Sequence, residues 1–471
     1  MIKHILAISA LLLTASTAFG EAAPRLFSFG TTPVGISNTR AEVLAAERVN
    51  IDISVIAANP EFFQVPLLNG TQQLAKRTRF EYRGFEDFTW RGQFDDSASG
   101  TLVLTVHQGV VIGFIQHAEK TYIIENLQDG SEVMMEIDQG LYPECAGVEV
   151  PSETGLPPRN LAQVSSGDTA ARIDVMVMYT PEARDAAGGV AAIEATAQAA
   201  VDTANTAFTD SDVITRFHLV HAEVTTYHDS GNSSLDLSWL SNDVGVAALR
   251  NTKGADMVSL LTQDGGGYCG RGYVMRTPSA AFESSAFQVT ARGCAVGNLS
   301  WAHEHGHNMG MEHDPANGTS PATASYPWSF GHFVNASYRT VMSYSNQCPN
   351  GCTRVAHFSN PAVQHAGVDT GIADERDNHR TANLTAPIVA NFRTQVCTID
   401  TELLLENLTI STAEIYEACQ TITAGTGVTV TPTGSLTLRA GQNVVLDDGF
   451  KVESGGIFLV DIDPLVGAVQ N

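Results

Sequence analysis

Short apolar or alternating runs recur in the early part of the chain, and polar turn residues separate them. Runs of about four to eight residues bounded by Gly, Asp and Asn predict β-strands. The pattern predicts a small antiparallel sheet within a β-rich region that covers residues 21–150. The expected strands are Phe88–Gly92, Thr101–Val106, Val110–Ile115, Tyr122–Ile124 and Glu132–Ile137.

Between residues 172 and 395, apolar runs typical of buried strands alternate with longer helical stretches. This order predicts an α/β domain, in which long helices cover a twisted, mostly parallel sheet with right-handed crossovers. The expected strands are Arg172–Tyr179, Val213–Val224, Ala255–Leu261 and Ala286–Thr290, and the expected helices are Glu182–Phe208 and Val244–Arg250.

Residues 396–471 return to short apolar segments that glycines separate, most clearly over residues 425–463. Recurring short strands with glycine turns predict a small all-β module of stacked strands or a solenoid. The module contains no catalytic constellation. Attachment to a surface or to a substrate and a purely structural role as a cap are its two alternative functions.

The N-terminus has the pattern of a targeting segment. Lys3 precedes the apolar run Ile5–Leu13, and Ala18 and Gly20 fit the small-x-small rule for cleavage. We therefore expect a signal peptide over residues 1–20. The run is too short to span a bilayer comfortably, and no other stretch is apolar enough to do so. These patterns predict a secreted, extracellular protein without a transmembrane segment.

Residues 151–171 are rich in Pro, Ser, Gly and Thr. This composition is typical of a flexible linker and of a site for proteolytic cleavage. The segment stands between the β-rich region and the α/β region. A cut within it, for example after Arg159, would separate the two.

Composition limits the classes of partner. The chain has 471 residues, which is too long for one ordinary domain, and its hydrophobic fraction of 43% is sufficient for real cores. Its formal net charge is −25, and no basic cluster interrupts the acidity. Because such a surface repels phosphate backbones, nucleic-acid binding is excluded. Structural Ca²⁺ is compatible with the acidity but is not indicated, since no aspartate-rich loop has calcium-site spacing. The sequence does not define the oligomeric state.

The most informative stretch is His303–His313, which reads H-E-H-G-H-N-M-G-M-E-H. His303 and His307 stand four residues apart, so a helix presents both imidazoles on one face, where they can bind one ion. Glu304 lies about 100° around the helix axis from His303 and can reach a water molecule bound to that ion. His305 points to the opposite face, so we do not expect it to be a ligand.

The second half of this stretch supplies a third ligand. Gly310 tolerates the left-handed conformation that ends a helix. The chain then turns, and His313 returns toward the first two histidines. Three neutral imidazoles with one open position are typical of a catalytic site rather than a structural one. We therefore predict one catalytic Zn²⁺.

The pattern H-E-x-x-H-x-x-G-x-x-H is similar to the zinc signature of the metzincin metallopeptidases. Downstream, T-V-M-S-Y resembles the Met-turn of that family, with Met342 beneath the metal. Together with I-D-V-M-V-M-Y-T-P, G-A-D-M-V-S-L-L and F-S-N-P, these motifs make residues 172–395 similar to reprolysin-like metzincins. Within that group, the bacterial peptidyl-Asp metallopeptidase type is the nearer match. The resemblance implies a metzincin catalytic domain that acts on protein or peptide substrates.

The resemblance also implies roles for single residues. Glu304 would act as general base on the metal-bound water. Met342 and Tyr344 have the Met-x-Tyr spacing of astacins and serralysins, where the tyrosine reaches the metal. We therefore predict that Tyr344 stabilises the tetrahedral oxyanion, although a core aromatic is the alternative. The expected strand Ala286–Thr290 corresponds to the edge strand that pairs with extended substrate in the family.

The seven cysteines predict a disulfide framework, because an exported protein can oxidise them. Six lie after residue 260 and group as neighbours along the chain. The pairs we predict are Cys269–Cys294, Cys348–Cys352 and Cys397–Cys419.

Cys145 remains outside these pairs. It precedes the linker, within Pro143–Gly147, and this setting resembles the cysteine switches of metzincin pro-domains. A thiolate is a strong zinc ligand, so we predict that Cys145 is a zymogen latch and that the β-rich region is a pro-domain. Glu144 occupies the position where such switches often have a basic residue. An unpaired or dimer-forming cysteine, and an accessory β-domain retained in the mature protein, are the alternatives.

Two other functions compete with a zinc endopeptidase. One is a catalytically inactive, protease-like binding or adhesion protein, and Glu304 argues against it because an inactive relative has no need of the general base. The other is a zinc enzyme that acts on a non-peptide bond. The Met-turn and the strand before the zinc helix favour a peptide substrate instead.

Overall fold

The computed structural model describes residues 23–31, 40–84, 86–94, 100–151, 170–397, 399–463 and 466. The expected signal peptide, residues 1–20, lies outside these residues, as does nearly all of the expected linker, including Arg159. Among the described residues, no helix combines the length and the apolar character needed to cross a membrane.

The N-terminal region is a nine-stranded sheet in the order β1-β2-β9-β8-β7-β6-β5-β4-β3, and its neighbouring strands are antiparallel. It is larger than the small sheet predicted, because the expected strands correspond only to β5–β9. Its elements are β1 (Phe27–Phe29), β2 (Val43–Ile51), α1 (Ile53–Ala57), β3 (Phe62–Pro66), β4 (Gln72–Gly84), β5 (Asp87–Phe94), β6 (Thr101–His107), β7 (Val110–His117), β8 (Lys120–Asn126) and β9 (Glu132–Ile137).

The middle region contains a six-stranded sheet in the order β10-β14-β15-β13-β11-β12. Every neighbouring pair is parallel except β14 and β15, which are antiparallel. Its strands are β10 (Val148–Glu149), β11 (Arg172–Tyr179), β12 (Arg216–Val224), β13 (Met257–Thr262), β14 (Gly270–Tyr273) and β15 (Phe287–Ala291). Its helices are α2 (Pro181–Ala187), α3 (Val190–Thr209), α4 (Ser233–Asn242), α5 (Val244–Lys253), η1 (Ala280–Ser285), α6 (Arg292–Ala295), α7 (Ser300–Asn308), η2 (Ser345–Gln347) and α8 (Asn378–Val389).

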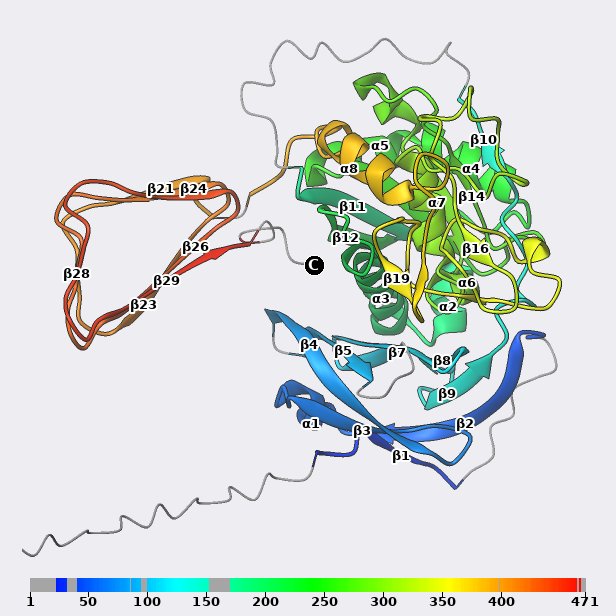
Figure 1. The fold of residues 1–471 in the computed structure, drawn as a ribbon, viewed down its shortest axis with the longest axis horizontal. Coiled ribbons are helices and arrows are strands. Elements are labelled where there is room, and N and C mark those ends of the chain that lie inside the picture. Colours follow the sequence, from blue (N-terminus) through cyan, green and yellow to red (C-terminus); the bar gives the residue numbers. More distant parts are fainter. Residues whose placement is uncertain are drawn as a thin grey trace, which may run out of the picture.

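The long helix expected over Glu182–Phe208 is in fact two helices, α2 and α3. Gly188 and Gly189 separate them at φ +100° and +121°, a region that side chains with a Cβ avoid. α3 lies between the N-terminal sheet and the middle sheet and contacts β6, β7 and β12 (Figure 1). Because other elements pack against both sides of α3, most of its buried positions are small alanines. The helix therefore lacks a separate apolar stripe.

The strand expected to bind substrate is also placed differently. The predicted Ala286–Thr290 corresponds to β15, which lies inside the sheet between β13 and β14. The strand that follows β15 toward the edge is β14, which is short and contains two glycines, so its sequence gave no strand pattern. β14 pairs in parallel with β10, a two-residue strand from the N-terminal region.

Residues after α8 form a three-sided coil of parallel strands, seen as the triangle in Figure 1. Thr421 pairs with Asn443 and Ser435 with Ile457, so these turns are 22 residues apart, whereas Glu402 pairs with Thr421 only 19 residues on. The strands are β21 (Glu402–Leu405), β22 (Thr409–Ile410), β23 (Ala413–Ala418), β24 (Thr421–Ala424), β25 (Thr429–Val430), β26 (Ser435–Ala440), β27 (Asn443–Leu446), β28 (Lys451–Val452) and β29 (Ile457–Ile462).

Disulfides join three pairs of segments, and short strands organise the loops after α7. The three predicted disulfides, Cys269–Cys294, Cys348–Cys352 and Cys397–Cys419, are confirmed, and Cys145 is a free thiol. The short strands are β16 (Phe333–Val334), β17 (Tyr338–Arg339), β18 (Thr353–Arg354), β19 (Gln364–His365) and β20 (Val368–Asp369).

Candidate active site

Helix α7 is completely buried and carries His303, Glu304 and His307. It ends at Asn308, and Gly310 follows at φ +85°, the left-handed conformation predicted for it. The Met311 N–H then donates to the carbonyl oxygen of Gly306 at 2.9 Å. This tight turn reverses the direction of the chain, so that the side chain of His313 faces α7.

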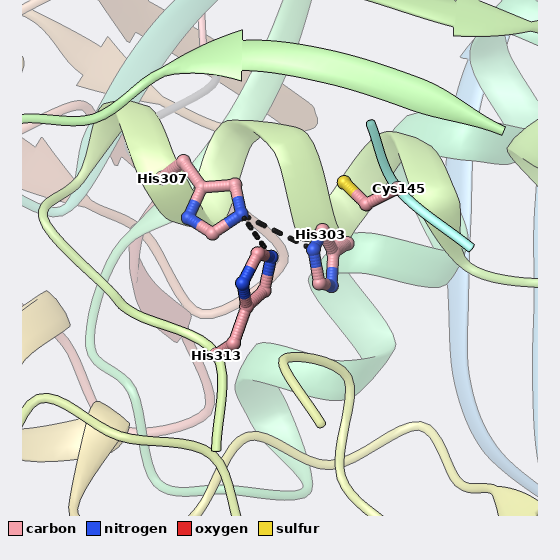
Figure 2. Close-up of side chains that lie close together, drawn as sticks. All are labelled: Cys145, His303, His307 and His313. Carbon is pink, nitrogen blue, oxygen red and sulfur yellow. Dashed lines mark hydrogen bonds between the residues drawn. The ribbon is translucent and has the colours of Figure 1, made fainter. Parts of the chain in front are cut away.

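The three imidazoles converge on one point (Figure 2). The Nε2 atom of His307 lies 3.2 Å from Nε2 of His303 and 3.0 Å from Nε2 of His313. Each Nδ1 instead faces a backbone carbonyl, so the neutral rings donate from Nδ1 and present bare Nε2 atoms to the centre. The acceptors, in the order His303, His307 and His313, are the carbonyl oxygens of Val341 at 2.8 Å, Met311 at 2.7 Å and Asn317 at 3.2 Å.

The electrostatics of this group favour a cation. Burial lowers the pKa of His303 and His307 well below the ordinary value and that of His313 to about 4. Neutral rings with facing lone pairs repel one another unless a positive charge lies between them. The donor set therefore fits a metal ion, with three nitrogens and one sulfur, from Cys145, whose ligand atoms all lie within 4.8 Å of one another.

Cys145 reaches the group from the N-terminal region, and its thiol donates to Oε1 of Glu304. Burial raises the pKa of the Cys145 thiol well above its ordinary value and that of Glu304 to about 8. Tyr344 holds the same segment, because its hydroxyl donates to the carbonyl oxygen of Cys145 at 3.1 Å. The ring of Tyr344 lies over His313, with centroids 4.2 Å apart.

Two glycines make room for the site. A Cβ on Gly270 would lie 2.5 Å from Oε1 of Glu304, so this glycine lets the carboxyl lie against β14. A Cβ on Gly306 would lie 2.6 Å from Sδ of Met342, so the predicted Met-turn residue packs directly under the helix. His305 lies outside the histidine group, and its ring packs against Trp301 at 4.1 Å between centroids.

The segment that contains Cys145 lies along the edge of the middle sheet as an added strand. The Cys269 N–H donates to the carbonyl of Glu144 at 3.1 Å, and the Ala146 N–H donates to the carbonyl of Gly270 at 2.9 Å. Further along, Val148 pairs with Gly272 in parallel register. A cleft of about 480 Å³ borders this segment, and its lining includes His313, Tyr344 and Arg276.

Asp314, which directly follows the third histidine, accepts the backbone N–H of Tyr344 at 3.1 Å and so orients the Met-turn loop. Sequence reasoning missed three other residues at this site. Glu312, fully buried beside His313, is paired with Arg276 at 2.7 Å. Arg354 lies near Glu144, at 3.9 Å between Nη2 and Oε2. Arg276 and Arg354 lie far from α7 in sequence, and nothing in the local pattern indicated them.

Comparisons with known proteins agree with this geometry. A family model described as metallo-peptidase family M12 matches residues 169–359, which include all three converging histidines. The peptidyl-Asp metalloendopeptidase of Xanthomonas campestris pv. campestris is 30% identical over 374 residues, which cover 74% of this chain and 86% of that protein. The peptidyl-Asp metalloendopeptidase of Stenotrophomonas maltophilia is also 30% identical, with the same coverage.

A third relative, the peptidyl-Asp metalloendopeptidase of Pseudomonas aeruginosa, is 32% identical over 258 residues, which cover 50% of this chain and 42% of that protein. The matched region thus holds the histidine group and its helix, and the similarity to the first two relatives extends over most of both chains. On these grounds the protein belongs to metallo-peptidase family M12 and is a metalloendopeptidase, a hydrolase that acts on peptide bonds.

Proposed function

We propose that this protein is a secreted zinc endopeptidase that is made as a zymogen, with His303, His307 and His313 as ligands of one catalytic Zn²⁺. The observation that carries the proposal is the convergence of three bare Nε2 atoms beside a buried glutamate. Zinc suits three nitrogen ligands in tetrahedral geometry with one open position. When bound, it would lower the pKa of a water ligand and polarise the scissile carbonyl.

Three side chains around the histidines have separate roles in this proposal. Glu304 takes the proton of the attacking water and returns it to the leaving amine. Tyr344 donates its hydroxyl to the oxygen of the scissile carbonyl, as it does to the carbonyl of Cys145 in the precursor. Met342 packs beneath the ligands and shapes the floor of the site.

Extended substrate would bind at β14, which becomes the edge strand once β10 and the segment around Cys145 leave it. The relatives are named for action at peptidyl-Asp bonds, and we propose the same preference here. Secretion is supported by the three disulfides, which form in oxidising compartments. Attachment through the C-terminal coil stays a prediction.

Casein hydrolysis tests the function directly. The full-length chain, activated by limited proteolysis within residues 151–171, should degrade casein. A chelator should abolish this activity, and stoichiometric Zn²⁺ should restore it. Activity that survives exhaustive chelation would contradict metal-dependent hydrolysis, and complete absence of activity would favour an inactive binding protein.

The Tyr344→Phe variant should lower kcat on a peptide substrate by roughly 10²-fold and leave KM nearly unchanged, because it removes one donor to the developing oxyanion. Steady-state kinetics of the activated protein measure both constants. Phenylalanine keeps the tilted ring contact with His313. An unchanged kcat would mean that Tyr344 has only a packing role.

The zymogen part of the proposal rests on Cys145, whose sulfur lies among the three histidines. Its thiolate would occupy the position that activates water. Buried polar contacts also hold the N-terminal sheet against the middle region. Asp202 on α3 accepts from Thr105 at 2.7 Å and pairs with Arg91 at 3.1 Å. We propose that residues 21–150 act as a pro-domain that holds the latch in the cleft.

The Cys145→Ser precursor is expected to hydrolyse peptide without cleavage of the linker, at a rate well above that of the uncut wild type. Serine is a far weaker zinc ligand than a thiolate, so water can compete for the metal. A fluorogenic peptide assay on both uncut chains makes the comparison, and gel analysis verifies that they stay uncut. Equal inactivity of the two, together with failure of a thiol reagent to activate the wild type, would exclude the latch.

A further inference from the structure

We propose that Arg354, with Arg339 and Ser345, forms a subsite for an acidic side chain next to the scissile bond, and that Glu144 occupies this subsite in the precursor. The inference rests on the proposed peptidase function and names the residues that would give it its preference. It also assigns a second element of autoinhibition beside Cys145.

Glu144 is held by three groups of the middle region. Its Oε1 accepts the backbone N–H of Ser345 at 2.7 Å and also the Ser345 hydroxyl. Its Oε2 lies 3.9 Å from Nη2 of Arg354. Burial would raise the pKa of Glu144, but the charges of Arg354 and Arg339 and the hydrogen bonds from Ser345 outweigh burial and hold that pKa below its ordinary value. Ser345 directly follows Tyr344, so the subsite is continuous with the catalytic loop.

The two arginines form an incompletely neutralised cationic pair. Arg354 and Arg339 are only 2% and 1% exposed. Both donate to carbonyl oxygens, including that of Ser343, and neither Nε has a hydrogen-bond partner among the described residues. Within the described part of the chain, the carboxylate found within 4.0 Å of either guanidinium is that of Glu144. Burial, together with the charge of the neighbouring Arg354, lowers the pKa of Arg339 to about 9.

Buried charges of one sign are costly unless an opposite charge pairs with them. In the precursor the N-terminal region supplies that charge through Glu144, and it also supplies the Gln139 carbonyl, which accepts from Arg339 at 3.2 Å. When this region leaves, the cationic pair loses the Glu144 carboxylate and the Gln139 carbonyl and keeps its bonds to the carbonyl oxygens of Ser343 and Asn298. A carboxylate of the substrate would then replace that of Glu144. Its pairing with the two arginines would contribute to the free energy of substrate binding.

The position of Glu144 identifies which substrate residue the subsite serves. Cys145 places its sulfur at the point where the scissile carbonyl would meet the metal, and Glu144 is the adjacent residue in the segment that bonds through its backbone to Cys269 and Gly270. Its side chain therefore occupies the space of a residue that flanks the cut. Arg271 on β14 is a second cation beside this segment, but it pairs with Glu149 at 3.0 Å, four residues beyond Cys145. Arg276 is already neutralised by buried Glu312.

The first experiment compares two peptides that differ only in Asp or Asn next to the cut, with mass spectrometry to locate the cut bond. The activated wild type should prefer the Asp peptide by about 10²-fold or more in kcat/KM, since removing one member of a buried charge pair has effects of this size. Arg354→Gln should reduce this ratio to within about tenfold of unity. Ser345→Ala is a milder variant and should lower it several-fold.

Arg271→Gln is the matched control, because it makes the same substitution at the other arginine that pairs with a glutamate of the same segment. It should leave the Asp/Asn ratio intact. An unchanged ratio in both Arg354→Gln and Ser345→Ala, or a collapse in Arg271→Gln instead, would overturn the assignment. Failure of the activated wild type to cleave either peptide or casein would refute the proposed function and is a separate outcome.

The second experiment examines occupancy in the uncut chain without measuring activity. The other six cysteines are in disulfides, so a maleimide reports on Cys145. Glu144→Gln and Arg354→Gln should each raise the labelling rate by roughly tenfold, and the double variant should not exceed the larger single effect. Additive effects would show that the two side chains act independently and would overturn the proposed pairing.

Discussion

The Glu304→Gln variant is expected to fold, to keep its metal and to lose peptide hydrolysis by on the order of 10⁴-fold, the upper end of a general base's contribution. Glutamine keeps the shape of the side chain but cannot take a proton from water. Gly270 and the buried helix surround the carboxyl closely, so the substituted side chain stays in the same position. The three histidines are untouched, so metal content should remain near that of the wild type.

Three measurements on the activated protein distinguish a lost base from a damaged fold. They are kcat on a peptide substrate, metal content by mass spectrometry, and the thermal unfolding midpoint. Glu283→Gln is a suitable control, since Glu283 pairs with Arg393 away from the cleft and should retain turnover. Near-normal hydrolysis by Glu304→Gln would show that another group takes the proton.

The features of the candidate site that can be read from sequence are local. His303 and His307 lie one helical turn apart, and Gly310 needs only its own backbone freedom to end the helix. The histidine group follows from such short-range geometry, because few other conformations satisfy the same spacing. The disulfide pairs were accessible for a similar reason, since each joins neighbours in the order of cysteines along the chain.

The parts that sequence did not predict depend on contacts between distant residues. Glu144 and Ser345 are 201 residues apart, and no periodicity or motif links them. In sequence, Glu144 only marked a departure from the usual cysteine switch. In the structure, Glu144 accepts a hydrogen bond from Ser345 and lies near Arg354, so the acidic residue at this position makes specific contacts. The edge strand β14 was missed for another reason, because G-R-G-Y lacks the β-branched alternation that predicts strands.

In the fold, too, some features follow from the local sequence and others depend on contacts between distant residues. The break between α2 and α3 is visible in sequence as two adjacent glycines, yet the alanine-rich run around them favoured one helix. Helix propensity is a weak local preference, and two consecutive residues with positive φ override it. The burial of α3 between two sheets could not be read from its own sequence, because the second sheet comes from a different region of the chain.

The second large effect is expected for His307→Ala, which removes the imidazole that lies between the other two. Two histidines alone hold zinc weakly, so the activated variant should contain little metal and show no measurable hydrolysis. In the uncut chain the outcome differs, because the sulfur of Cys145 lies within the same group. We expect the uncut single variant to retain part of its zinc through His303, His313 and Cys145.

A double variant therefore gives the decisive measurement. Uncut His307→Ala/Cys145→Ser should lose nearly all bound metal after dialysis, whereas uncut Cys145→Ser should keep about one ion per chain on three imidazoles. His305→Ala is the matched control on the same helix. It also removes a buried imidazole, but one that packs on Trp301 outside the group, so it should lower the unfolding temperature and keep the metal. Stoichiometric zinc in the double variant would mean that His307 is not a ligand.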